Sequence, residues 1–513
     1  MNSFSKVLAV SQPMTGLSSY KIALQASFAG LLFPFGFAPF HMPGLALLSL
    51  AIFFVLLQNR TLKESLLTGY LFGIVSLGVG VSWVYVSIHQ YGHLNLLGST
   101  IITALFILYL SLYPLLVAAV YYFAMQQHFS MVYRCVLFTS IWCFGEYLRA
   151  TLLGGFPWLL LGFSQIETPI KYVLPWLGVY GASFFASLAA CFLGGAFLIK
   201  TSKRYGLIAA FAATLILPGL FNIPWGTSTS APISVGIIQA NLSMRDKWDE
   251  NLFWQLITQY KQAAEQLLKT NQLVVMPESA IPVPAPYISD FLDELDSKAN
   301  EAGSTVLLGI LQPTEFDDSK LYNAMLALGD GQGIYQKQHL VPFGEYIPAP
   351  LQALIEWMAI PVANLNPGKS TQPLVFIQNH PIASLICYEL AYPQLLRKQL
   401  PLAEWIVSIS DDGWFGHSFA MHQQLQMARA LSIQTAREQI VANNDGLSSV
   451  IDANGQIVDS LPAYREGLLE SHIQPIRGST LWVYWGDLPI LIICLFVIGL
   501  AFYLGSALKR GRF

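Results

Sequence analysis

The charged residues of this 513-residue chain are concentrated in one central block, and long apolar runs lie on both sides of it. Residues 232–477 contain 14 basic and 26 acidic residues, whereas residues 1–231 contain only 10 and 3, and residues 478–513 contain 3 and 1. This distribution, in a chain that is 54% hydrophobic, is typical of a membrane protein with one polar domain outside the bilayer. The net charge of −3 gives no electrostatic basis for binding nucleic acid.

The apolar runs are long enough to form transmembrane helices. Such a helix needs about 20 apolar residues, because no water in the bilayer core can satisfy its backbone polar groups. The sequence predicts a membrane domain of seven helices (1–231), a polar domain (232–477) and an eighth helix with a short tail (478–513). We expect the spans near residues 20–36, 43–58, 66–88, 96–125, 134–150, 172–199, 205–222 and 486–508.

Lysine and arginine in the short connections predict the orientation of these spans. Eleven of them lie on the side that includes both termini, and only Arg149 and Lys171 lie on the other side. Because basic loops stay in the cytoplasm, we expect cytoplasmic termini and an extracytoplasmic domain over 232–477. Glu146 and Arg149 are three residues apart near a span end, where they form either a structural pair or a contact with lipid headgroups.

The polar domain alternates between strand-length apolar runs and amphipathic helical patterns. Apolar stripes at helical spacing occur over residues 253–267 and 288–299. The strand-like runs are Ile233–Gln239, Leu273–Met276, Thr305–Ile310, Ala324–Leu328, Ile382–Cys387, Trp405–Ile409 and Ile440–Ala442. Strands that alternate with amphipathic helices predict an α/β fold with buried strands.

Three strand-like runs deliver residues with useful chemistry at their ends. These residues are Glu278, Lys337 and Cys387, and the last is the only cysteine of the polar domain. Sites in α/β proteins collect at the carboxyl ends of strands. A carboxylate can take the proton of a thiol, and an ammonium can stabilise the oxyanion that forms when the thiolate attacks a carbonyl. Taken singly, each residue is more commonly a surface, salt-bridge or core residue, so their proximity decides the hypothesis.

Four segments resemble the nitrilase, or carbon–nitrogen hydrolase, superfamily: Met276-Pro-Glu-Ser-Ala-Ile-Pro282, Tyr335-Gln-Lys-Gln-His-Leu-Val-Pro-Phe-Gly-Glu345, Leu385-Ile-Cys-Tyr-Glu389 and Asp412-Gly-Trp-Phe-Gly416. The superfamily's Glu-Lys-Cys triad maps onto Glu278, Lys337 and Cys387, and the resemblance implies an α-β-β-α sandwich. Together with the eight expected spans, the motifs are most similar to the bacterial apolipoprotein N-acyltransferases. One departure is Asp411, which stands where that family often has Asn.

The resemblance implies a two-step acyl transfer at the bacterial inner membrane. The cysteine takes a fatty acyl chain from a phospholipid, typically phosphatidylethanolamine, and forms a thioester. The α-amino group of the diacylglyceryl-modified N-terminal cysteine of an apolipoprotein then accepts the acyl chain. Such a covalent intermediate predicts ping-pong kinetics. The orientation above places the domain that carries the cysteine in the periplasm.

The resemblance also points to supporting residues. Glu345 matches a carboxylate near the triad, where it orients Lys337, shares the proton transfer or forms a plain salt bridge. Tyr388 and Glu389 flank the nucleophile and either shape the acyl pocket and position Lys337 or pack in the core. Trp248 is similar to a tryptophan associated with substrate handling, or it packs at a helix start. No cofactor is implied, and no metal site is expected because metal-ligand spacing is absent.

Residues 346–364 combine many large apolar side chains, Trp357 among them, with several prolines and few charges. We expect either a lid that dips into the membrane over the site or an ordinary core helix.

Two other functions stay open on the sequence alone. A membrane-anchored amidase or nitrilase would hydrolyse the same acyl-enzyme with water, although the apolar spans favour a lipid donor. A transporter or receptor with an extracytoplasmic binding domain would require Cys387 to be incidental.

Overall fold

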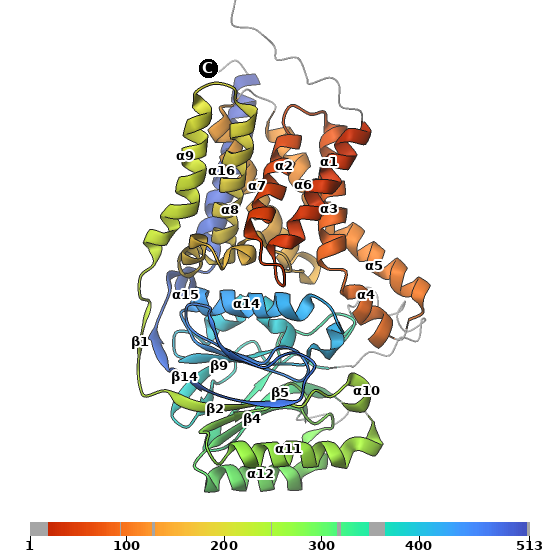
Figure 1. The fold of residues 1–513 in the computed structure, drawn as a ribbon, viewed down its shortest axis with the longest axis vertical. Coiled ribbons are helices and arrows are strands. Elements are labelled where there is room, and N and C mark those ends of the chain that lie inside the picture. Colours follow the sequence, from red (N-terminus) through yellow and green to blue (C-terminus); the bar gives the residue numbers. More distant parts are fainter. Residues whose placement is uncertain are drawn as a thin grey trace, which may run out of the picture.

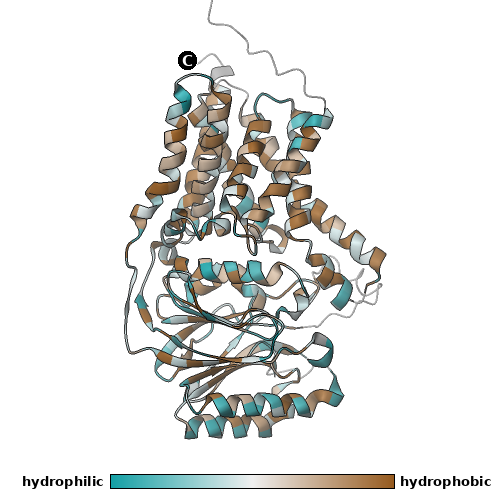
Figure 2. Cartoon of the chain, in the orientation of Figure 1, coloured by the Kyte–Doolittle hydropathy of each residue, from teal (hydrophilic) through white to brown (hydrophobic). Residues whose placement is uncertain are grey.

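A bundle of apolar helices and a domain of two β-sheets lie one above the other in the computed structural model, with helix α14 (Ala420–Thr435) between them (Figure 1). The structure describes residues 19–92, 94–125, 129–247, 249–314, 320–347 and 365–509. Hydrophobic residues predominate in the bundle, whereas the helices at the far end of the sheet domain are hydrophilic on their outer side (Figure 2).

The bundle is built from both ends of the chain. Rings from three of its helices meet in its core, where Phe53 stacks on Phe72 with centroids 4.4 Å apart and both lie edge-on to Trp142. Its helices are α1 (Ser19–Leu32), α2 (Pro43–Leu56), α3 (Leu62–Gly80), α4 (Val84–Val86), α5 (Leu96–Leu110), α6 (Leu112–Ala124), α7 (Met131–Thr151), α8 (Leu174–Leu198), α9 (Lys203–Ile216) and α16 (Leu488–Lys509).

Five helical segments of the described chain are long and apolar enough to cross a membrane. They are Leu62–Gly80, Leu96–Ala124, Pro169–Leu198, Lys203–Phe221 and Leu488–Ala507, and α2 is a shorter apolar helix. Each coincides with one of the expected spans. The other expected spans correspond to α1, α2 and α7, which do not meet the requirements for both length and hydropathy. The total of eight spans therefore stays a prediction.

Two of the expected spans are interrupted within the described chain. The span over 66–88 is not one helix, because α3 ends at Gly80 and α4 begins only at Val84. The span over 96–125 divides at Ser111 into α5 and α6. Pro114 follows directly and cannot donate a backbone hydrogen bond to the preceding turn, which accounts for the break.

The polar domain consists of two stacked sheets with helices outside them, so the α-β-β-α arrangement is confirmed. The expected strands all appear, as do α11 (Phe253–Leu267) and α12 (Ser289–Glu301) at the two apolar stripes. One sheet has the order β14 (Gly467–Ile473), β2 (Ile233–Gln239), β3 (Leu273–Val275), β4 (Thr305–Pro313), β5 (Leu321–Gly329) and β7 (Ile334–Gln336). The other has the order β13 (Ile457–Ser460), β12 (Ser449–Ile451), β11 (Gln439–Asn443), β10 (Trp405–Ser410), β9 (His380–Ile386), β8 (Val375–Ile377) and β6 (Gly331–Gln332).

Parallel pairing in both sheets brings strand ends together. In the first sheet β2, β3 and β4 are parallel, and in the second β9, β10 and β11 are parallel. A dry core of side chains such as Val235, Leu273, Ile386 and Val407 fills the space between the sheets. The outer face of the first sheet packs on α11 and α12, and the outer face of the second packs on α14. A short pair, β1 (Gly226–Ser228) and β15 (Ile476–Gly478), lies where the chain enters and leaves the domain.

Helix α14 attaches the sheet domain to the bundle through polar side chains on one face. Gln423 donates to the carbonyl of Gly80 (3.0 Å), and Gln426 accepts from the backbone N–H of Ala38 (3.1 Å). Arg429 pairs with Glu167 (2.6 Å) on the bundle side. The spacing 423, 426 and 429 places all three on one side of a helix, so the two parts are held in a fixed orientation.

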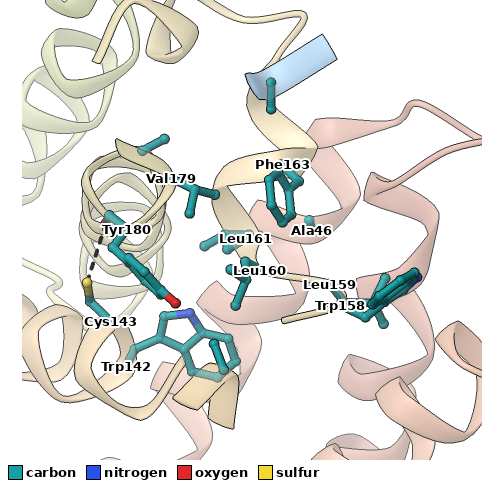
Figure 3. Close-up of a cluster of buried hydrophobic side chains, with 14 of the residues drawn as sticks. Ala46, Trp142, Cys143, Trp158, Leu159, Leu160, Leu161, Phe163, Val179 and Tyr180 are labelled. Atoms are coloured by element: carbon teal, nitrogen blue, oxygen red, sulfur yellow. Dashed lines mark hydrogen bonds between the residues drawn. The ribbon is translucent and has the colours of Figure 1, made fainter. Parts of the chain in front are cut away.

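The segment that follows α7 is held by Arg149 rather than by an ion pair of Arg149 with Glu146. The buried guanidinium donates to the carbonyls of Phe156 and Trp158 and to that of Leu159 (3.3 Å). Glu146 accepts from the N–H of Leu161 (2.8 Å). Figure 3 shows the resulting turn, with Trp158 pointing away from Tyr180 and Trp142. The expected pair between Glu146 and Arg149 is therefore wrong, although both residues hold this segment in place through separate backbone contacts.

We predict that Arg149→Ala destabilises the protein by about 3 kcal/mol, because it leaves three buried carbonyls without a donor. Thermal unfolding of the purified protein in detergent measures this as a lowered Tm. Lys63→Ala on the exposed start of α3 is the control and leaves the Tm unchanged. An Arg149→Ala protein as stable as the control would contradict this role.

Candidate active site

Cys387 lies at a tight turn where β9 ends. Its backbone has φ = 55°, a left-handed conformation that is uncommon for residues other than glycine and often marks functional sites. A short helical turn, Cys387–Ala391, begins at this residue, and only 7% of its surface is exposed. Burial raises the pKa of the Cys387 thiol, the charge of Glu278 raises it further, and Lys337 opposes both effects. The resting sulfur is therefore a thiol whose reaction needs a base.

Glu278 lies in the turn after β3 and is nearly buried. Its backbone crosses β4 at Gly309, whose N–H donates to the Pro277 carbonyl (3.2 Å). A Cβ atom at position 309 would lie 2.6 Å from the Cα of Glu278 and 2.5 Å from the Pro277 oxygen. Only glycine leaves room for this close approach, which fixes the position of the carboxylate.

Lys337 follows β7, and its ammonium lies between two carboxylates. Its Nζ is 3.2 Å from Glu278 Oε1 and 2.9 Å from Glu345 Oε1, and the side chain is 1% exposed. Burial alone lowers the pKa of this ammonium, but Glu278 and Glu345 raise it, and the net shift is upward. Lys337 is therefore a fixed positive charge beside the Cys387 turn.

Asn323 on β5 joins the same group. Its Nδ2 donates to Glu278 Oε1 (2.7 Å) and to Glu345 Oε1 (3.1 Å), while Glu345 Oε2 accepts from the N–H of Val341 (2.8 Å). The sequence analysis missed this asparagine, because nothing in the spacing around residue 323 distinguishes it from other strand residues. Glu345 is thus part of the charge network and forms a salt bridge with Lys337, while a role in orienting Lys337 or in proton transfer stays a prediction.

Glu389 connects the Cys387 turn to the segment that carries Lys337. The carboxylate is fully buried and accepts from Tyr335 Oη (3.1 Å), from the N–H groups of Gln338 (2.7 Å) and His339 (3.0 Å), and from the N–H of Ile386 (2.9 Å). Burial raises the pKa of Glu389 to about 7, although these donors lower it. Of the roles expected for Glu389, its contacts favour the positioning of Lys337.

Tyr388 points from the Cys387 turn toward the bundle. Its ring stacks on Trp158 with centroids 5.9 Å apart, and its hydroxyl accepts from Tyr392 (3.0 Å). Trp158 packs against Trp83 (5.3 Å), and Trp83 packs edge-on against Phe415 (4.9 Å). An aromatic wall of Tyr388, Trp158, Trp83 and Phe415 therefore extends from the Cys387 turn to the bundle.

Two sequence hypotheses lie outside the described residues. Trp248 is not among them, and the expected lid over 346–364, which includes Trp357, is described only at its first two residues. Within the described parts of the chain, no group of three or more His, Cys, Asp or Glu side chains is arranged to hold a metal ion.

Comparison with known proteins agrees with this geometry. The carbon–nitrogen hydrolase model matches residues 234–479, so the sheet domain that carries Glu278, Lys337 and Cys387 is similar to the carbon–nitrogen hydrolases. A second model, the apolipoprotein N-acyltransferase N-terminal domain, matches residues 29–192.

Relatives that match nearly the whole chain identify the family more specifically. The apolipoprotein N-acyltransferase of Methylococcus capsulatus is 34% identical over 94% of this chain and 96% of its own. That of Coxiella burnetii is 35% identical over 92% of this chain and 98% of its own. The chain belongs to the apolipoprotein N-acyltransferase family. Among solved structures, a carbon–nitrogen hydrolase from Helicobacter pylori matches 48% of this chain and 90% of its own, with a TM-score of 0.38 and 16% identity.

We predict that Gly309→Ala lowers kcat by about 10- to 100-fold and changes KM little, because the added Cβ displaces the Glu278 carboxylate without removing it. Steady-state acylation assays measure this. Gly206→Ala is the matched control, because a Cβ at position 206 meets open space. A Gly309→Ala protein with unchanged kcat would show that the close approach does not set the position of Glu278.

Proposed function

We propose that this protein transfers a fatty acyl chain from a phospholipid, through a thioester on Cys387, to the α-amino group of the diacylglyceryl-modified N-terminal cysteine of apolipoproteins. One observation carries the proposal. A buried ammonium, Lys337, touches a buried carboxylate, Glu278, at 3.2 Å beside the turn that presents Cys387, in a chain of this family.

The first step forms the thioester. Glu278 accepts the thiol proton while the Cys387 sulfur attacks the ester carbonyl of the phospholipid. Negative charge develops on the former carbonyl oxygen, and the ammonium of Lys337 stabilises it. The carbon–oxygen bond to glycerol then breaks, Glu278 returns the proton to the glycerol oxygen, and a lysophospholipid leaves.

The second step transfers the acyl chain to nitrogen. The α-amine of the lipoprotein attacks the thioester carbonyl and loses a proton to Glu278. The carbon–sulfur bond breaks, an amide forms, and the proton returns to Cys387. Each step leaves the charges of Glu278 and Lys337 as they were before it.

The supporting residues hold the charged side chains of Lys337 and Glu278 in place. Glu345 and Asn323 hold Lys337 and Glu278 in place, and Glu389 fixes the distance between the Lys337 segment and the Cys387 turn. Tyr388 lines the route by which an acyl chain reaches the sulfur from the bundle side, and Trp248 contributes to substrate handling.

The placement in the membrane follows from charge and hydropathy. Eight spans with both termini in the cytoplasm put the catalytic domain (232–477) in the periplasm, held between the membrane domain (1–231) and the final helix (478–513). Both substrates keep their chains in the bilayer, so a site that the aromatic wall joins to the bundle suits them. Phosphatidylethanolamine is the proposed donor.

Intact mass spectrometry of the purified protein with phosphatidylethanolamine tests the proposal. We expect the wild type to gain the mass of one fatty acyl group, and Cys387→Ser to gain none that hydroxylamine at neutral pH removes. Lys261→Met, on the exposed face of α11, is the control and acylates like the wild type. A wild type that never gains an acyl group would contradict the thioester mechanism.

The fate of the thioester distinguishes the transferase from an amidase or nitrilase. Adding a diacylated lipopeptide to the acylated protein should yield triacylated lipopeptide. Free fatty acid without acylated peptide would indicate hydrolysis instead.

A further inference from the structure

A second buried ion pair lies beside the catalytic group. Lys247, at the end of the short helix α10 (Met244–Lys247), pairs with Asp411, which follows β10. Their side chains are 1% and 4% exposed. The mechanism above uses neither residue. A buried ion pair has a large desolvation cost and is weak evidence for stability by itself, so its contacts must explain it.

Both members of the pair touch Glu278. The ammonium of Lys247 donates to the backbone carbonyl of Glu278 (3.0 Å), and the backbone N–H of Asp411 donates to Glu278 Oε2 (3.0 Å). Lys337 and Asn323 occupy the other carboxylate oxygen. One carboxylate oxygen of Glu278 is therefore held by Lys337 and Asn323, and the other is held by the backbone of Asp411.

Asn444 extends the pair to the strand-end loops. Its Nδ2 donates to Asp411 Oδ1 (3.2 Å) and to the carbonyl of Leu242 (2.8 Å), and its Oδ1 accepts from the N–H of Leu242 (3.1 Å). The loop after β2 that ends in Lys247 is thereby fixed against the loop after β10. This fixes the turn of Glu278 between them.

Carboxylates outnumber ammonium groups around Glu278. The groups that face it are Lys337, Glu345, Asn323, Cys387, Lys247, Asp411, Asp412 and, one layer further, Asp445. Burial raises the pKa of Asp412 to about 7 and that of Asp445 to about 8, and neighbouring carboxylates raise both. An excess of negative charge in this region is therefore unfavourable, and the ammonium of Lys247 offsets one carboxylate.

We propose that Lys247 and Asp411 are positioning residues that hold Glu278 in place and balance the charge beside its carboxylate. The inference rests on the proposed function of Glu278 as the base. Removing the charge of Asp411 leaves an unpaired ammonium next to Glu278, which disfavours adding a proton to its carboxylate. Removing the charge of Lys247 leaves an unpaired carboxylate, which has the opposite effect.

The test is the rate of acyl-enzyme formation between pH 5 and pH 10, followed by intact mass spectrometry with phosphatidylethanolamine in detergent micelles. We expect the acid limb of the profile to move about one pH unit lower in Asp411→Asn and about one pH unit higher in Lys247→Met. The double variant should return to within a few tenths of a pH unit of the wild type, because both charges are gone.

The exposed pair Lys261–Glu294 is the matched control, and Lys261→Met and Glu294→Gln leave the acid limb in place. If Lys247→Met fails to fold, the pH of the acid limb is compared between Asp411→Asn and the double variant. The inference would be overturned if the acid limb of the pH profile lay at the same pH in all variants, or if it moved in the same direction in both single variants. The proposed function would stand in either case. A wild type that forms no acyl-enzyme would overturn both.

Discussion

The structure depends on keeping one ammonium charged inside a protein core. Isolated in such a place, Lys337 would lose its proton, because burial disfavours the charged form. Glu278 and Glu345 on either side reverse this, and Asn323 bridges the two carboxylates. The same contacts keep Glu278 beside the Cys387 turn. The contacts that keep this cation charged thereby also fix the Glu278 carboxylate, so the charge balance and the geometry of the group have one origin.

The second constraint is the position of this group relative to the helical bundle. Helix α14 packs one face on the β9–β10 side of the sheet, and its other face binds the bundle through Gln423, Gln426 and Arg429. Arg149 fixes the turn that brings Trp158 against Tyr388, one residue after the nucleophile. The position of the Cys387 turn relative to the helical bundle is therefore set by polar contacts and ring packing between residues far apart in sequence.

Local sequence patterns predict the helices and strands of this protein, but they do not predict contacts between residues that are far apart in the chain. A strand-length apolar run predicts β2, and an apolar stripe at helical spacing predicts α11. Strand ends and motifs together predict that Glu278, Lys337 and Cys387 form one group. Helix α14 shows no clear apolar stripe, because both of its faces are buried and one of them binds polar groups. Asn323 and the pairing of Lys247 with Asp411 likewise give no local signal, since their partners lie far along the chain.

The central claim is that the acyl chain rests on the protein before the acceptor arrives. The most direct measurement is rapid-quench detection of lysophospholipid when enzyme is mixed with phospholipid alone. The account predicts a burst of one lysophospholipid per active site without any lipopeptide, absent in Cys387→Ser. Lysophospholipid that appears only after a diacylated lipopeptide is added would mean direct transfer between the two substrates and would contradict the account.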